Sequence, residues 1–126
     1  MLFREVTFNE WKPASSKGHE NVDFWSGNHP STIAVRGWLF WRLEAGRFNF
    51  VSHSVIEENG TLIDITPIGG NMLHEHLLFL QHLGSDEEFE AIKKCHSCLV
   101  FPPFSNAEFS SVSGELEENA SEDMCG

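Results

Sequence analysis

Apolar and polar side chains alternate along much of the first half of the chain, and this two-residue period predicts β-strands. Residues 2–11 alternate in this way and predict a first strand or extended arm. Residues 32–43 and 47–57 are rich in β-branched and aromatic side chains, which favour strands. Residues 61–66 follow the pair Asn59-Gly60, and Asn-Gly accepts the positive φ angles of a tight hairpin turn. The last two strands are therefore expected to form a hairpin.

Helical patterns lie on both sides of these strands. Residues 19–26 predict a short helix, and residues 72–83 predict a second one because their leucines recur at helical spacing. Ser85 is a good N-cap residue, and Glu88 three positions later completes a capping box for a third helix that runs to about Lys94.

These elements predict an α+β fold: an antiparallel sheet of four to five strands, with one helix before it and two helices after it. Residues 1–104 are expected to form a single globular domain. Residues 105–126 are expected to form an acidic C-terminal tail, since they hold six acids and no base.

Charge and composition narrow the class of partner. The chain has 126 residues and a net charge of −11, so it repels phosphate backbones and anionic lipid surfaces. We therefore expect neither a nucleic-acid partner nor a membrane partner. No apolar run approaches the length of a membrane helix, and residues 1–5 do not resemble a secretion signal. These features favour a cytoplasmic protein.

The hairpin carries the residues with the most evident chemistry. A two-residue turn at Asn59-Gly60 pairs Glu58 with Thr61, which places His53 and Asp64 on one sheet face as diagonal neighbours. A carboxylate that binds an imidazole fixes its tautomer and stabilises its protonated form. A three-residue turn would shift the register and move Asp64 to the other face. In the plain structural alternative, His53 and its partner form only a satisfied hydrogen bond.

The segments His53-Ser-Val-Ile-Glu57 and Gly60-Thr-Leu-Ile-Asp64-Ile-Thr-Pro67 resemble the His and Asp strands of transglutaminase-like, papain-like cysteine enzymes. The resemblance covers roughly residues 18–67. It implies that His53 is a catalytic general base and that Asp64 orients it. It also implies a nucleophilic cysteine at the start of a preceding helix, where this chain has Gly18. The resemblance therefore implies a catalytically degenerate domain, with acyl transfer or amide hydrolysis as the ancestral reaction.

Two further residues are candidates for binding. His19 follows the position where the nucleophile is expected, and Trp38 lies three residues before Trp41, so the two indoles face opposite sides of a strand. Leu39 and Leu43 share the parity of Trp41, which favours Trp41 as core and leaves Trp38 for a pocket or a subunit contact. The alternative is a different class of function: a module without catalysis that binds a small molecule or peptide, or that assembles as a homodimer.

A third possibility is a small zinc-binding protein. Cys95 and Cys98 form a Cys-x-x-Cys pair, and His74 or His76 would supply further ligands. A second ligand pair in sequence is absent, so the plainer expectation is two structural thiols after a helix. No cofactor is implied by any motif in the chain.

Overall fold

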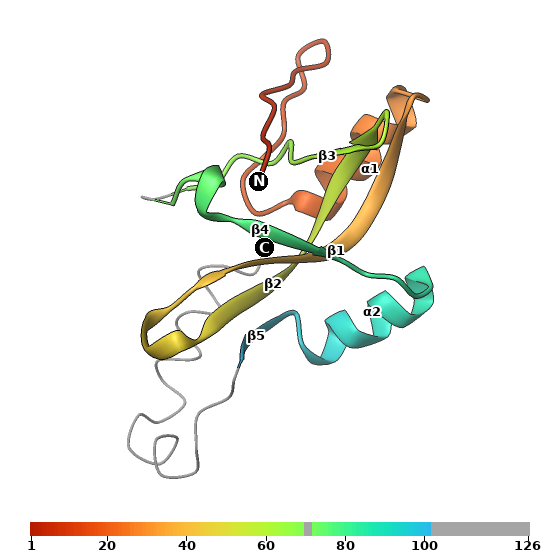
Figure 1. Cartoon of the computed structure of the whole chain (residues 1–126). Helices are drawn as coiled ribbons and strands as arrows, with labels where there is room; N and C mark the ends of the chain where they lie inside the picture. The colour runs from red at the N-terminus through yellow and green to blue at the C-terminus, as the bar shows by residue number, and fades with distance from the viewer. Residues whose placement is uncertain (70–71, 102–126) are drawn as a thin grey trace.

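A long antiparallel hairpin forms the frame of the protein (Figure 1). The computed structural model describes residues 1–69 and 72–101. Strand β1 (Thr32–Arg42) pairs over its whole length with β2 (Phe48–Glu58), and a single 3-10 turn, η1 (Glu44–Gly46), joins them. The sheet continues on both sides of this hairpin in the order β3-β2-β1-β4, with β5 also paired to β2.

Two short strands share the outer edge of β2. Strand β3 (Thr61–Ile63) pairs with residues 56–58, and β5 (Cys98–Phe101) pairs with residues 48–51. Between them, residues 53–55 have no strand partner on this edge among the described parts of the chain. This interval in the sheet edge contains His53.

Helices cover one face of the sheet at two places. Helix α1 (Gly18–Asn28) packs Val22 against Ile56, and helix α2 (Asp86–Cys95) packs Phe89 against Trp38. The opposite face holds a second core, where Leu77 closes over β1 and β2; its buried members are Leu39, Trp41, Val51 and Leu77. The burial of Trp41 and the placement of Trp38 on the other face agree with the parity in the sequence.

The helix predicted over residues 72–83 is wrong. The chain forms a 3-10 turn, η2 (His74–His76), and then strand β4 (Leu78–Gln81), which pairs antiparallel with β1. Leu77 is 1% exposed, whereas Leu80 is 54% exposed. The free edge of β1 offers main-chain partners to this segment, and that pairing outweighs its helical leucine spacing. Helix α1 therefore precedes the strands of the sheet, and α2 lies between β4 and β5 in the chain, whereas the sequence predicted two helices after the sheet.

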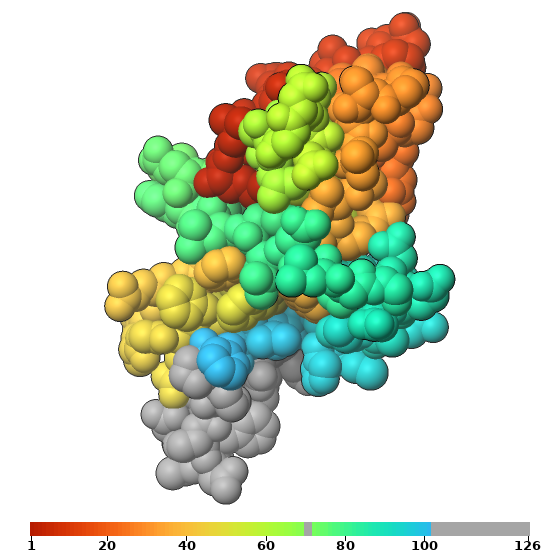
Figure 2. All heavy atoms as spheres, turned by 45° about the vertical axis from the view of Figure 1, so that its right-hand side comes forward, coloured from red at the N-terminus to blue at the C-terminus, as the bar shows by residue number. Residues whose placement is uncertain are grey.

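The chain ends of the described region also differ from the strand pattern. Residues 2–11 form only isolated bridges, one of them parallel between Phe3 and Asp64. Of the two predicted forms, this segment is therefore an extended arm and not a regular strand. Figure 2 shows these first residues, in red, lying against the yellow-green segment that contains β3.

The predicted N-cap is confirmed, since Ser85 Oγ accepts a hydrogen bond from Glu88 N–H at 3.1 Å. The predicted tail, residues 105–126, lies outside the described residues. Among the helices described, none is long and apolar enough to cross a membrane.

Candidate functional site

The hairpin turn sets the register that the sequence predicts. Asn59 and Gly60 have φ values of 52° and 79°, and Glu58 pairs with Thr61. As a result His53 Nε2 lies 2.9 Å from Asp64 Oδ1, and the carboxyl group is fully buried. A carboxylate oxygen only accepts hydrogen bonds, so Nε2 carries the proton and donates it. In the neutral ring, the second nitrogen, Nδ1, then presents a lone pair.

A second histidine contacts the same carboxylate. Asp64 Oδ1 also accepts from the main-chain N–H of Thr66 at 3.1 Å, while Oδ2 lies 3.4 Å from His74 Nε2. His74 Nε2 donates to the carbonyl oxygen of Thr66 at 3.1 Å, and its ring stacks on Phe3 with centroids 3.9 Å apart. Asp64 therefore lies between two imidazoles. No spacing in the sequence indicates this role for His74, because η2 approaches Asp64 only in the folded chain.

Gly18 lies directly against the free side of His53. It is the first residue of α1, and a Cβ atom built on it would lie 2.5 Å from His53 Nδ1 and 2.6 Å from Cε1. Such distances are shorter than any van der Waals contact, so the imidazole occupies the space of a side chain at this position. No described residue forms a hydrogen bond with Nδ1. The three positions of the predicted constellation are thus together, with glycine where the resemblance implies a nucleophile.

A buried asparagine holds the start of α1 in place. Asn21 Nδ2 donates to Ala14 O at 2.8 Å and to Thr66 Oγ1 at 3.0 Å, and its Oδ1 accepts from Ala14 N–H. These bonds connect the loop before α1, the helix itself and the segment after β3. Asn21 therefore positions Gly18 against His53 from two directions.

His19 contacts two serine hydroxyls of β2. Its Nδ1 lies 2.6 Å from Ser54 Oγ, which itself accepts a hydrogen bond from Arg36 Nη1 at 2.7 Å, and its Nε2 lies 3.5 Å from Ser52 Oγ. Burial, followed by the nearby cations Lys93 and Arg36, lowers the pKa of His19 to about 4. The ring is therefore neutral at physiological pH.

This lowered pKa predicts a loss of stability in acid. The unfolded chain binds a proton at His19 near pH 6.5, and the folded chain does so near pH 4, so folding becomes less favourable as the pH falls between these values. After allowance for partial exposure, the loss is on the order of 1–2 kcal/mol. Urea denaturation at pH 7 and pH 4.5 measures it. His19→Gln should reduce the difference, and the exposed control His76→Gln should leave it unchanged; equal pH dependence in all three proteins would contradict the assignment.

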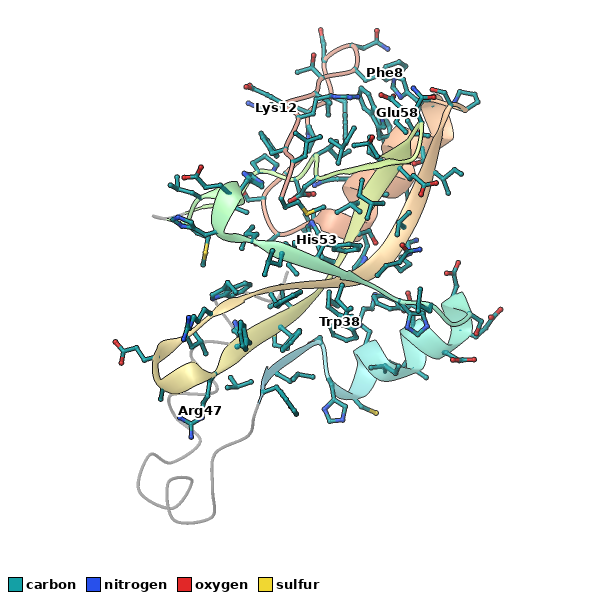
Figure 3. The ribbon with its side chains drawn as sticks, viewed as in Figure 1. Phe8, Lys12, Trp38, Arg47, His53 and Glu58 are labelled. Atoms are coloured by element: carbon teal, nitrogen blue, oxygen red, sulfur yellow. The ribbon has the colours of Figure 1, made fainter. Side chains whose placement is uncertain are left out.

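A cavity of about 430 Å³ opens beside these groups. Its polar end contains Gly18, His19 and His53, and Figure 3 shows His53 beside the first turn of α1. Among the described residues that line it, none has an acidic or a cationic side chain. The lining consists of Ser15, Ser16, Gly18, His19, Leu39, Trp41, Val51, Ser52, His53, Pro67, Ile68, Gly69, Met72 and Leu77.

Two predicted binding groups lie elsewhere. Trp38 projects from the opposite sheet face and contacts Phe89, with ring centroids 5.6 Å apart, so it does not line the cavity (Figure 3). Cys95 is exposed at the end of α2. Within residues 1–69 and 72–101, no three His, Cys, Asp or Glu side chains are grouped closely enough to hold a metal ion.

Comparison of the chain with protein-family models, with curated proteins and with solved structures finds no match.

Proposed function

We propose that this protein is a catalytically silent relative of the transglutaminase-like cysteine enzymes and that it binds a small ligand in its cavity. The observation that carries the proposal is the contact between Gly18 and His53. A helix begins against the unpartnered nitrogen of a histidine whose other nitrogen is held by a buried aspartate. In a nucleophile-base-acid triad the nucleophile belongs at that contact, beside the base.

The absence of turnover follows from chemistry. Glycine has no group that can attack an acyl carbon, and the imidazole itself fills the space beside it. Ser15 and Ser16 line the cavity, but neither forms a hydrogen bond with a described residue that would activate it. His53, held by Asp64, then supplies part of a polar wall for a ligand.

Ligand binding is supported by the cavity itself. Its volume lies in the range of small-molecule sites, its walls are mostly apolar, and its few polar groups converge at one end. His53 lines the cavity, and its Nδ1 has no hydrogen-bond partner among the described residues, so it is available to a group inside the cavity. A bound ligand provides that partner.

Restoring a thiol tests the proposed ancestry. In Gly18→Cys, the ring of His53 must move aside to admit the Cβ atom. The introduced thiol then lies at a helix start beside His53, and both features lower a thiol pKa. A thiol pKa lowered by about two units strongly raises the fraction of thiolate at pH 6. A thiolate of lower pKa is also less nucleophilic, so the net gain in alkylation rate is about tenfold. The measurement is the iodoacetamide labelling rate at each cysteine, resolved by peptide mass spectrometry.

Gly27→Cys is the matched control, because position 27 lies in the same helix with no atom near its Cβ. The thiol at position 18 should react about tenfold faster than the thiol at position 27 at pH 6, and His53→Gln in the Gly18→Cys background should remove the difference. Equal rates at the two positions in folded proteins would contradict the triad geometry. Circular dichroism of Gly18→Cys and Gly18→Ala checks that a side chain at this position is accepted.

Assembly as a homodimer is a second proposal. Strand β4 is an edge strand, and its Leu78 and Leu80 are 52% and 54% exposed. Exposed apolar edges favour strand addition by another chain, and a second copy offers the same edge. Sedimentation velocity over a range of protein concentrations distinguishes a dimer from a monomer.

A further inference from the structure

We infer that the cavity binds a monocarboxylic acid with an aliphatic tail, with the carboxyl group at the polar end of the cavity, beside His53 and the first turn of α1. This inference deepens the proposed function, because it assigns a ligand class to the same cavity. It rests on three features of the polar end and walls: free main-chain donors, an unpartnered imidazole nitrogen and an uncharged apolar lining.

The start of α1 offers main-chain donors. The N-cap residue, Lys17, makes no side-chain capping bond, and the first N–H with an intrahelical partner is that of Asn21, which bonds Lys17 O at 2.8 Å. No described residue accepts a hydrogen bond from the main-chain N–H groups of Gly18, His19 or Glu20. Gly18 and His19 also line the cavity. Free N–H groups at a helix start favour a ligand oxygen with negative charge.

The imidazole of His53 supplies the second and independent observation. Its side chain is only 9% exposed, it lines the cavity, and Nδ1 has no described partner. Because Asp64 fixes the proton on Nε2, Nδ1 needs a ligand group that brings a proton. A carboxyl group suits both the helix start and the imidazole, since one of its oxygens accepts from the helix N–H groups and the other shares a proton with Nδ1.

The walls select the rest of the ligand. Leu39, Trp41, Val51 and Leu77 form the apolar body of the cavity. No charged side chain lies among the described lining residues, so a second carboxylate or an ammonium group would be buried without a partner. An unbranched aliphatic tail satisfies this lining.

Binding should consume a proton. The charged and titratable groups that face His53 are Asp64 at Nε2 and the neutral ring of His19, with His74 on the other oxygen of Asp64. A free carboxylate and the neutral form of the His53 ring have no shared proton, and the complex has one, which comes from solvent. Affinity should therefore fall with rising pH, by up to about tenfold per pH unit, wherever the free ring is neutral.

Three ligands that share the same aliphatic tail and differ in the head group test the inference: octanoate, octanamide and octan-1-ol. Each is titrated into isotope-labelled protein and followed by NMR. We expect octanoate to bind at least tenfold more tightly than the other two at pH 6.5, to shift the methyl signals of Val51 and Leu77, and to weaken with rising pH. His53→Gln should remove the pH dependence, and the exposed control His76→Gln should keep it.

Three results would overturn the inference: equal or tighter binding of the amide or the alcohol, octanoate binding that does not change with pH, and shifts confined to the exposed Leu78 and Leu80. Failure of all three ligands to bind would overturn it as well. None of these results bears on the thiol-labelling comparison at position 18, so the ligand class can fail while the triad-derived site stands.

Discussion

Replacing Asp64 with alanine should destabilise the protein by about 2–5 kcal/mol, because it removes a fully buried carboxylate that accepts hydrogen bonds from His53 and Thr66. The change leaves the His53 Nε2–H and the Thr66 N–H without an acceptor, and it empties the space between His53 and His74. A buried donor without a partner costs its full desolvation free energy. Urea denaturation at pH 7 measures the loss.

Two variants separate the causes. Asp64→Asn keeps an oxygen for His53 and Thr66 but removes the charge, so its loss should be smaller, about 1–2 kcal/mol. Asp23→Ala removes a carboxylate that is 55% exposed and paired with Arg36, and it should cost less than about 1 kcal/mol. A similar loss in Asp64→Ala and Asp23→Ala would show that the buried pair does not hold the site together.

Substituting Gly37 by valine should detach β4 from the sheet. Gly37 lies opposite His53 in the hairpin, and a Cβ atom there would overlap the main-chain oxygen of Leu80 and would lie 2.5 Å from the ring atom Cζ of Phe79. The main chain cannot move aside cheaply, so overpacking should cost about 2–3 kcal/mol. Hydrogen exchange of the amides in residues 78–81 should accelerate more than exchange elsewhere in the sheet.

Gly27→Ala is the control for this substitution. Position 27 lies in α1 with no atom within 4 Å of a built Cβ, so alanine there should stabilise the protein by up to about 1 kcal/mol. If Gly37→Val is as stable as the parent protein, β4 does not approach β1 as closely as the structure describes.

Local chemistry explains why the sequence predicted the His53–Asp64 pair. The Asn59-Gly60 turn fixes the hairpin register, and the period of two then decides which side chains share a face. The position of Gly18 followed from the family resemblance and not from any local rule. The structure brings it to His53 through the buried bonds of Asn21.

Non-local pairing explains what the sequence did not predict. Residues 72–83 have helical leucine spacing, but the unpaired edge of β1 converts part of this segment into β4. The arrangement around His19 joins Ser54, Arg36 and Lys93 from two strands and a second helix, and no sequence spacing connects them. Trp38 was a candidate for binding because of its parity, yet the helix that covers its face supplies Phe89 as its partner.

The ring of His53 offers the most direct test of the central claim. This claim is that an imidazole bonded to Asp64 presents its other nitrogen to the start of α1. Long-range ¹H–¹⁵N spectra near pH 8 report the tautomer, and nuclear Overhauser effects report the neighbours of the ring. We predict a proton on Nε2, a bare Nδ1, and a strong effect between the Hε1 of His53 and the Hα protons of Gly18. A proton on Nδ1, or the absence of any effect between His53 and Gly18, would contradict the account.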